Sequence, residues 1–287
     1  MKRFLKYTLY LILYTLFFSS CEKIDNPYLP APTGGGDTTV AVKVRKLLIE
    51  DFTGHKCGNC PGAATTIQTI KGIHGDKVIS IALHTNFYAE PDLPPSPYTY
   101  DFRTSAGDEY DLFFQPFGWP AGMINRRHYP GNHWKNLSNW ATIVDTLVAI
   151  PPDAYMEITN AYNSSTRQLN TSIRSEFLNP LNGTYKLIVL LTEDSIIKPQ
   201  KFYVPAVDSL TYVHRHVLRD CLTAINFGDA LISGTIAAGD TAVKTYNYTL
   251  PADFKGLAPN ENHCAVVAYI YDAATYEVIQ AEEKKIK

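Results

Sequence analysis

The chain has 287 residues and carries 26 Lys and Arg against 28 Asp and Glu, a formal net charge of −2 at pH 7. Charges of both signs are mixed along it, and this argues against a nucleic-acid-binding protein, which needs clustered Lys and Arg. Aromatic residues make up 12% of the sequence, ample for sizeable cores, and the length favours two domains rather than one.

The first 20 residues have the pattern of a secretory signal peptide. Basic residues precede an apolar run over residues 7–18, which is shorter than the roughly 20 apolar residues needed to cross a bilayer. The segment ends in Ser-Ser-Cys and resembles a bacterial lipoprotein box, although Phe18 stands where Leu is usual. We therefore expect lipidation at Cys21 and a membrane-anchored mature protein. The alternative is an ordinary signal peptide that is cleaved nearby.

Residues 21–40 are rich in Pro and Gly without periodicity, and they predict a flexible tether. A buried strand is predicted over residues 42–52 and is broken by Gly54. A helix is predicted over residues 61–75 and a second strand over residues 78–84.

The next stretch continues the alternation of helices and strands. A Pro-rich loop, residues 89–100, precedes a predicted helix over residues 104–114. A short strand is predicted over residues 121–127, and an amphipathic helix over residues 138–150. Pro151 and Pro152 end that helix and mark the predicted domain boundary.

Beyond this boundary the pattern changes to short segments with alternating, β-branched or aromatic residues. Turns such as "LNGT" and "AAGDT" separate them, and six or seven strands with few helices predict an antiparallel β-sandwich of the immunoglobulin-like kind. The segments are "AYMEITNAY", "QLNTSIRSEF", "YKLIVLLTE", "AVKTYNYTL", "CAVVAYIYD" and "TYEVIQAEE". The predicted organisation is a signal peptide (1–20), a tether (21–40), an α/β domain (41–151) and a β-sandwich domain (152–287).

The sequence "EDFTGHKCGNCPGA" places Cys57 and Cys60 between a strand and a helix. A thiol at a helix N-terminus is stabilised as a thiolate by the helix dipole, and a second thiol one turn along can resolve a mixed disulfide. His55 and Lys56 are expected to add positive charge. Pro61 is tolerated early in the helix because its missing N–H would be unpaired there.

Two other interpretations of this cysteine pair remain open. The pair could be a static disulfide that never exchanges. A zinc site would need two further ligands, and no second Cys-x-x-Cys accompanies the first. His214 and His216 would share one side of a strand and could bind a metal, but such pairs are usually ordinary polar surface.

The segment "EDFTGHKCGNC" resembles the active-site segment of the thioredoxin fold, and "FGWPAG" resembles its cis-proline loop. The resemblance makes Pro120 the candidate cis-proline and substrate platform. It also implies that Asp51, six residues before Cys57, relays protons to Cys60. The alternative for Asp51 is pairing with Lys46 or with solvent.

The chain departs from thioredoxins in ways that leave the redox direction open. Lys56 stands where thioredoxins have Trp, and the residues between the cysteines are Gly58 and Asn59. They match neither the Gly-Pro of reductive members nor the Pro-His of a strong oxidant.

Several segments over nearly the whole mature chain resemble the outer membrane protein 28-related lipoproteins. They are "FTGHKCGNCPGA", "GWPAGMINR", "YKLIVLLTEDSIIKPQ", "HRHVLRD" and "VVAYIYDAATYEVIQA". The resemblance implies a lipid-anchored envelope protein, periplasmic or surface-facing, with a thioredoxin-like domain followed by a β-rich one.

The two remaining cysteines are Cys221 and Cys264. Export to an oxidising compartment permits a structural disulfide between them, but two free buried thiols would give the same sequence.

Two functions fit these observations. The first is thiol–disulfide exchange on exported proteins, with Cys57 attacking, Cys60 resolving, Asp51 relaying protons and Pro120 positioning substrate. The second is a surface-binding or adhesion lipoprotein, in which the thioredoxin-like part is a scaffold. Neither requires a cofactor. The expected partners are exported thiols and disulfides or a surface ligand, together with the membrane through the lipid anchor.

Overall fold

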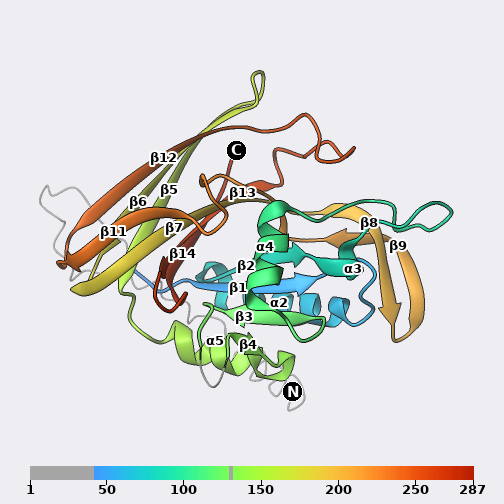
Figure 1. Ribbon diagram of the computed structural model, residues 1–287, viewed down its shortest axis with the longest axis horizontal. Helices are drawn as coiled ribbons and strands as arrows, with labels where there is room; N and C mark the ends of the chain where they lie inside the picture. Colours follow the sequence, from blue (N-terminus) through green and yellow to red (C-terminus); the bar gives the residue numbers. More distant parts are fainter. Residues whose placement is uncertain (1–41, 129–131) are drawn as a thin grey trace, which may run out of the picture. The chain divides into compact units, whose positions relative to one another are not determined.

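The computed structural model describes residues 42–128 and 132–287, of which residues 43–287 form one compact unit. The predicted signal peptide, the whole tether and the lipidation site at Cys21 lie outside the described residues. The architecture is mixed α/β joined to a β-sandwich, with a nine-stranded, a three-stranded and a two-stranded sheet in the described part of the chain (Figure 1).

The elements follow one another in this order along the chain. They are β1 (Leu47–Thr53), α2 (Cys60–His74), η1 (Gly75–Lys77), β2 (Val78–His84), α3 (Asn86–Ala89), α4 (Ser105–Phe114), β3 (Ala121–Ile124), β4 (Trp134–Lys135), η2 (Leu137–Asn139), α5 (Trp140–Val148), β5 (Ala154–Asn163), β6 (Gln168–Phe177), β7 (Leu181–Glu193), β8 (Ile196–Tyr203), β9 (Ala206–His214), β10 (Val217–Cys221), β11 (Asp229–Ile236), β12 (Thr241–Thr249), β13 (Cys264–Asp272) and β14 (Val278–Lys285).

The nine-stranded sheet runs in the order β14-β13-β7-β10-β2-β1-β3-β4, and β11 pairs with β7 outside this path. β1 and β2 are parallel, and α2 connects them; β3 is antiparallel to β1. The predicted strand over residues 78–84 and the predicted helix over residues 61–75 are confirmed to within a residue. Gly75 ends α2 with a φ of 61°, a conformation that favours glycine.

Helices cover both faces of this α/β part. On one face α2 and α5 bury aliphatic residues and Trp140 against β1 and β2, and on the other face α4 packs over the same strands. Strands buried on both faces read as continuous apolar runs, as β1 and β2 do. Gly122 in β3 allows Trp140 to approach the sheet, since a Cβ there would lie 1.9 Å from the indole ring.

β7 and β13 belong to two cores at once. Ile188 and Leu190 of β7 face the core beneath α4, whereas Leu187, Val189 and Leu191 face the sandwich core. The three-stranded sheet β12-β6-β5 closes that sandwich from the other side. The alternation of neighbouring residues between two cores explains why residues 187–191 of β7 and 264–271 of β13 are continuously apolar.

The sheet is continuous across the predicted boundary at residue 151, which falls between α5 and β5. β10 pairs with β2 at Val217 and Ala82, so strands from both sides of the boundary hydrogen-bond directly. A buried hydrogen bond also crosses it, because Arg126, which binds Glu50 at 2.7 Å, donates to the hydroxyl of Tyr269 on β13 at 2.8 Å. The α/β part and the sandwich therefore share one sheet and one hydrophobic core.

Cys221 and Cys264 are free thiols, so the possible disulfide between them is not formed. Cys221 lies on β10 and Cys264 on β13, and β7 runs between these two strands. Strands separated by a third lie about 10 Å apart, beyond the roughly 7 Å Cα separation that a disulfide spans. The two side chains also pack against different cores.

The sequence did not suggest a strand pair at residues 196–214, where β8 and β9 form a hairpin. These two strands pair only with each other in the described structure and project from one end of the large sheet (Figure 1). No helix of the described residues is long and apolar enough to cross a membrane.

Candidate functional site

A disulfide joins Cys57 and Cys60 at the junction between β1 and α2, with an S–S distance of 2.05 Å. Cys60 is the first residue of α2, and Cys57 lies in the loop before it. The loop is held by its own backbone, since Cys57 N donates to Gly54 O and Cys60 N donates to Cys57 O. The expected order of strand, Cys-x-x-Cys and helix is therefore present.

The β8–β9 hairpin lies along this loop like an added strand. Lys201 N donates to His55 O at 2.8 Å, and Tyr203 N donates to Gly58 O at 3.1 Å. These are two main-chain hydrogen bonds from alternate residues of one strand, the pattern of an edge-strand pairing.

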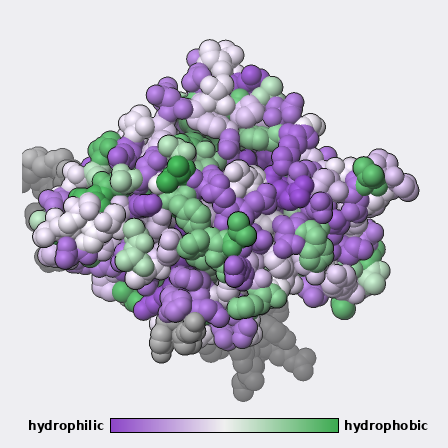
Figure 2. Space-filling view, viewed as in Figure 1, coloured by the Kyte–Doolittle hydropathy of each residue, from purple (hydrophilic) through white to green (hydrophobic). Residues whose placement is uncertain are grey.

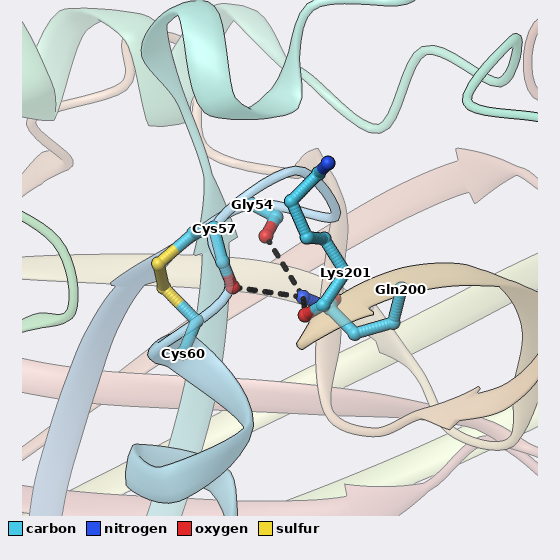
Figure 3. Close-up of a disulfide and its surroundings, with 5 residues drawn as sticks. All are labelled: Gly54, Cys57, Cys60, Gln200 and Lys201. Carbon is cyan, nitrogen blue, oxygen red and sulfur yellow. Dashed lines mark hydrogen bonds between the residues drawn. A yellow bond between two sulfur atoms is a disulfide. The ribbon is translucent and has the colours of Figure 1, made fainter. Parts of the chain in front are cut away.

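The Gln200 side chain completes the contact. Its amide nitrogen donates to Cys57 O at 3.0 Å and lies 3.4 Å from Gly54 O (Figure 3). It also bonds to Lys201 O at 3.0 Å, and Gln200 is 3% exposed. A buried amide that satisfies several carbonyls fixes the position of β8 relative to the disulfide.

The hairpin and its surroundings bury both cysteines. Cys57 and Cys60 are each 1% exposed. The Tyr203 ring packs directly on Gly58, where a Cβ would lie 2.3 Å from the ring. A protein thiol therefore cannot reach the disulfide while the hairpin stays in this position.

The expected positive charge beside the cysteines is largely absent. Lys56 forms an ion pair with Asp92 at 2.8 Å, which offsets its charge. Burial lowers the pKa of His55 to about 4, so its ring is neutral at physiological pH. The loop thus relies on backbone dipoles rather than on side-chain cations to stabilise a thiolate.

Asp51 is buried at 3% exposure on β1, and its Oδ1 has no hydrogen-bond partner among the described residues. Desolvation raises the pKa of this carboxyl to about 7. The alternative of pairing with Lys46 is wrong, because Lys46 binds Glu282 at 2.7 Å and Asp76 at 3.4 Å instead. Asp51 is therefore a proton-carrying group near neutral pH.

Asp51 and Cys60 line the same cavity, whose volume is about 40 Å³. That volume holds only a few water molecules. Four buried polar atoms of its lining residues lack a partner in the described structure: Asp51 Oδ1, Ser80 Oγ, His84 Nδ1 and His214 Nε2. The cavity is therefore lined at its centre by polar groups that lack partners among the described residues.

The three histidines that line this cavity, His84, His214 and His216, are uncharged at physiological pH, since burial lowers the pKa of His216 to about 4. Burial lowers the pKa of His214 to about 3 and that of His84 well below its ordinary value. The Phe102 ring packs between them and His55, with ring centroids 4.4 Å from His84 and 4.7 Å from His214. This aromatic packing supports the base of the hairpin, since His214 is the last residue of β9.

His214 and His216 do not share a strand as the sequence suggested. His214 ends β9, whereas His216 has a φ of 52° in the turn before β10. Within residues 42–128 and 132–287, no group of three or more His, Cys, Asp or Glu side chains is arranged to hold a metal ion.

Pro120 follows a cis peptide bond from Trp119, as the resemblance implies. It precedes β3, whose first residue Ala121 pairs with Phe52 near the end of β1. Pro120 lines a separate surface cleft of about 400 Å³ with Trp119 and Trp134, not the cavity of Asp51 and Cys60.

Sequence reasoning missed the residues that cover the site, namely Gln200, Lys201 and Tyr203. They lie about 140 residues after the cysteines, and their segment "KPQKFYVP" has no period that predicts pairing with the loop. One residue of the Pro-rich loop over residues 89–100, Tyr98, contacts the hairpin. Its hydroxyl donates to Asp208 on β9.

The fold and the site define a class: an α/β protein with a β-sandwich and a disulfide between a strand and a helix. The family model described as outer membrane protein Omp28 matches residues 107–287. The chain belongs to this family of outer membrane lipoproteins of the cell envelope. No curated protein matches it.

Two solved structures illustrate what the chain is similar to. HBP35 of Porphyromonas gingivalis has 16% identity and a TM-score of 0.61, with 85% of this chain and 76% of that chain covered. A domain of the outer membrane lipoprotein Omp28 from the same organism has 18% identity and a TM-score of 0.35, with 47% of this chain and 89% of that chain covered. At these identities the first likeness concerns the fold alone.

Proposed function

We propose that the protein is an outer membrane lipoprotein that exchanges disulfides with exported proteins through Cys57 and Cys60. In this proposal residues 41–151 are a thioredoxin-like part and residues 152–287 an immunoglobulin-like sandwich. Lipidation at Cys21 anchors the protein in the membrane. Pro120 keeps the role of substrate platform that the resemblance implies.

The observation that carries the proposal is the unpaired carboxyl of Asp51 at the cavity that Cys60 lines. A buried carboxyl without a partner weakens a fold, so its presence beside a cysteine pair favours a chemical role. With a pKa of about 7, Asp51 can give or take a proton at physiological pH. A static disulfide needs no such group.

The exchange balances without a cofactor. A thiolate of an exported protein attacks Cys57 Sγ, the Cys57–Cys60 bond breaks, and its electron pair leaves on Cys60 Sγ, which takes a proton from Asp51. A second thiolate of the same partner attacks the mixed disulfide and releases Cys57, so the partner loses two electrons and two protons. A disulfide of another exported protein then oxidises the Cys57–Cys60 pair by the reverse steps.

A second candidate function has an observation of its own. Both cysteines are only 1% exposed, as expected of a disulfide that merely holds the loop to α2. In that case the protein is a surface-binding lipoprotein whose α/β part is a scaffold.

Trapping distinguishes the two functions. Cys60→Ala in intact cells leaves Cys57 without its resolving partner, so mixed disulfides with exported proteins should accumulate on non-reducing gels. Cys57→Ala is the matched control, because it removes the same disulfide but leaves no attacking thiol. Equal amounts of adducts from the two variants, or none from either, would refute exchange.

A further inference from the structure

The segment Gln200–Tyr203 is bound to the cysteine loop as a peptide would be. Four backbone carbonyls of residues 54–58 face this segment and accept hydrogen bonds from it. They are those of Gly54, His55, Cys57 and Gly58. Because these carbonyl oxygens only accept hydrogen bonds, the segment that binds along this edge of the loop must supply several N–H or O–H donors. Main-chain N–H groups at alternate positions of an extended strand supply such donors.

Two side chains add selectivity to these main-chain bonds. Gln200 places an amide N–H₂ between Cys57 O and Gly54 O, and Tyr203 lays its ring on the bare backbone of Gly58. A residue with a Cβ at position 58 would exclude that ring. The loop therefore fits an extended strand with an amide side chain and, three residues later, an aromatic ring.

The hairpin that carries this segment is anchored at its base and through its bonds to the cysteine loop, whereas its tip is exposed. β8 and β9 pair with no strand of the large sheets in the described structure. Its tip carries the exposed residues Val204 and Val207, at 89% and 52% exposure, and Tyr203 itself is 47% exposed. Hydrophobic groups lie at the lower right of Figure 2, where Figure 1 places the hairpin. The tip of the hairpin, with so little buried apolar surface, opens at low cost.

We infer that the carbonyl edge of residues 54–58 is a binding groove for an extended polypeptide, held in this structure by the chain's own residues 200–203. An exported polypeptide with an amide and an aromatic side chain in the same spacing displaces the hairpin and so uncovers Cys57. The role of the groove in binding a substrate rests on the disulfide-exchange function proposed above. The binding of a polypeptide in the groove does not depend on that function.

The test uses the full-length protein in detergent and a fluorescent peptide of residues 196–206, IIKPQKFYVPA, which contains no cysteine. The double variant Gln200→Ala/Tyr203→Ala weakens the resident strand, so it should bind the peptide about tenfold more tightly than the wild-type protein does. Tyr203→Phe keeps the ring and should bind as the wild type does. A peptide carrying the same two Ala substitutions should bind at least several-fold more weakly to every form.

A measurement on the wild-type protein keeps the inference testable if the double variant fails to fold. Saturating peptide should speed hydrogen exchange at the amides of Lys201 and Tyr203, because the resident strand is displaced. Any of three results would refute the binding groove. The two peptides bind equally, the wild-type and double-variant proteins have equal affinity for the peptide, or hydrogen exchange at Lys201 and Tyr203 is unchanged by the peptide. If adducts are trapped but the peptide does not bind, the disulfide-exchange function stands and the groove is refuted. If the peptide binds but no adducts are trapped, the groove stands and the disulfide-exchange function is refuted.

Discussion

At the scale of single residues, the pKa of the Asp51 carboxyl is set by its surroundings. Its pKa rises from 3.8 to about 7 because burial penalises the charged form and no partner compensates. In the unfolded chain the same carboxyl ionises near its ordinary value. Between these two pKa values the folded state binds a proton that the unfolded state has released, so stability falls as the pH rises.

Asp51→Asn removes this pH dependence. A rise from pKa 3.8 to about 7 corresponds to about 4 kcal/mol of unfolding free energy that the wild type loses between pH 4 and pH 8 and the variant keeps. Urea unfolding of both proteins at pH 4 and pH 8 measures this change in unfolding free energy. Subtracting the change in the variant from the change in the wild type cancels the contributions of all other titrating groups. Parallel pH profiles for the wild type and the variant would mean that Asp51 is not buried and neutral in this way.

At the scale of elements, the loop before α2 and the β8–β9 hairpin act as one unit around the disulfide. Gly58 is the point of closest approach, since a Cβ there would lie 2.3 Å from the Tyr203 ring. The ring and the Tyr203 N–H cannot both keep their positions if this residue gains a side chain.

Gly58→Ala should therefore loosen the hairpin and expose the disulfide. We expect dithiothreitol to reduce the Cys57–Cys60 bond about tenfold faster, equivalent to about 1.4 kcal/mol of lost packing and hydrogen bonding. Thiol alkylation followed by mass spectrometry gives the rate. Gly62→Ala in α2 is the control, because a Cβ placed there would meet no atom within 4 Å beyond the adjacent residues and the backbone of its own helix. Equal reduction rates for the two variants would contradict the covering role of Tyr203.

The elements differ in how far the sequence could predict them. β2, β6 and β13 were predicted because their apolar or alternating residues pack on defined cores. The β8–β9 hairpin was missed, because it is held mainly by main-chain bonds, polar side chains and scattered aromatic contacts. Such interactions leave no hydrophobic period in the sequence.

The same contrast explains the prediction of the site. Cys57, Cys60 and Asp51 follow one another along β1 and its loop, so their spacing alone indicates where they meet. The neutral state of His55 depends on its burial in the folded protein, and the pairing of Lys56 depends on Asp92, which lies on a later loop. Tertiary contacts of that kind cannot be read from local sequence.

At the scale of the whole molecule, the α/β part and the sandwich are joined through the fully buried Arg126. Its guanidinium binds Glu50 of β1 in two hydrogen bonds of 2.8 and 2.7 Å and bonds to Tyr269 of β13. Four aromatic rings surround it, two from each side of residue 151. The loss of this one side chain affects both parts.

Arg126→Met leaves Glu50 buried without a partner and should cost about 3–5 kcal/mol of unfolding free energy. Arg174→Met, which removes surface ion pairs with Glu157 and Glu176, should cost less than about 1 kcal/mol. All three Trp residues lie before residue 151, whereas most strands lie after it. Trp fluorescence and far-UV circular dichroism should therefore report one common, shifted transition in Arg126→Met. Separate transitions, or a shift in only one signal, would show that the two parts unfold independently.

The central claim is that the Cys57–Cys60 disulfide exchanges with other proteins rather than merely holding the loop. Its reduction potential tests this most directly, by equilibration of the full-length protein in thiol–disulfide buffers and alkylation of the free thiols. We predict a potential above about −300 mV, in the range of disulfides that exchange with protein thiols. A potential below about −300 mV is typical of structural disulfides and would contradict the account.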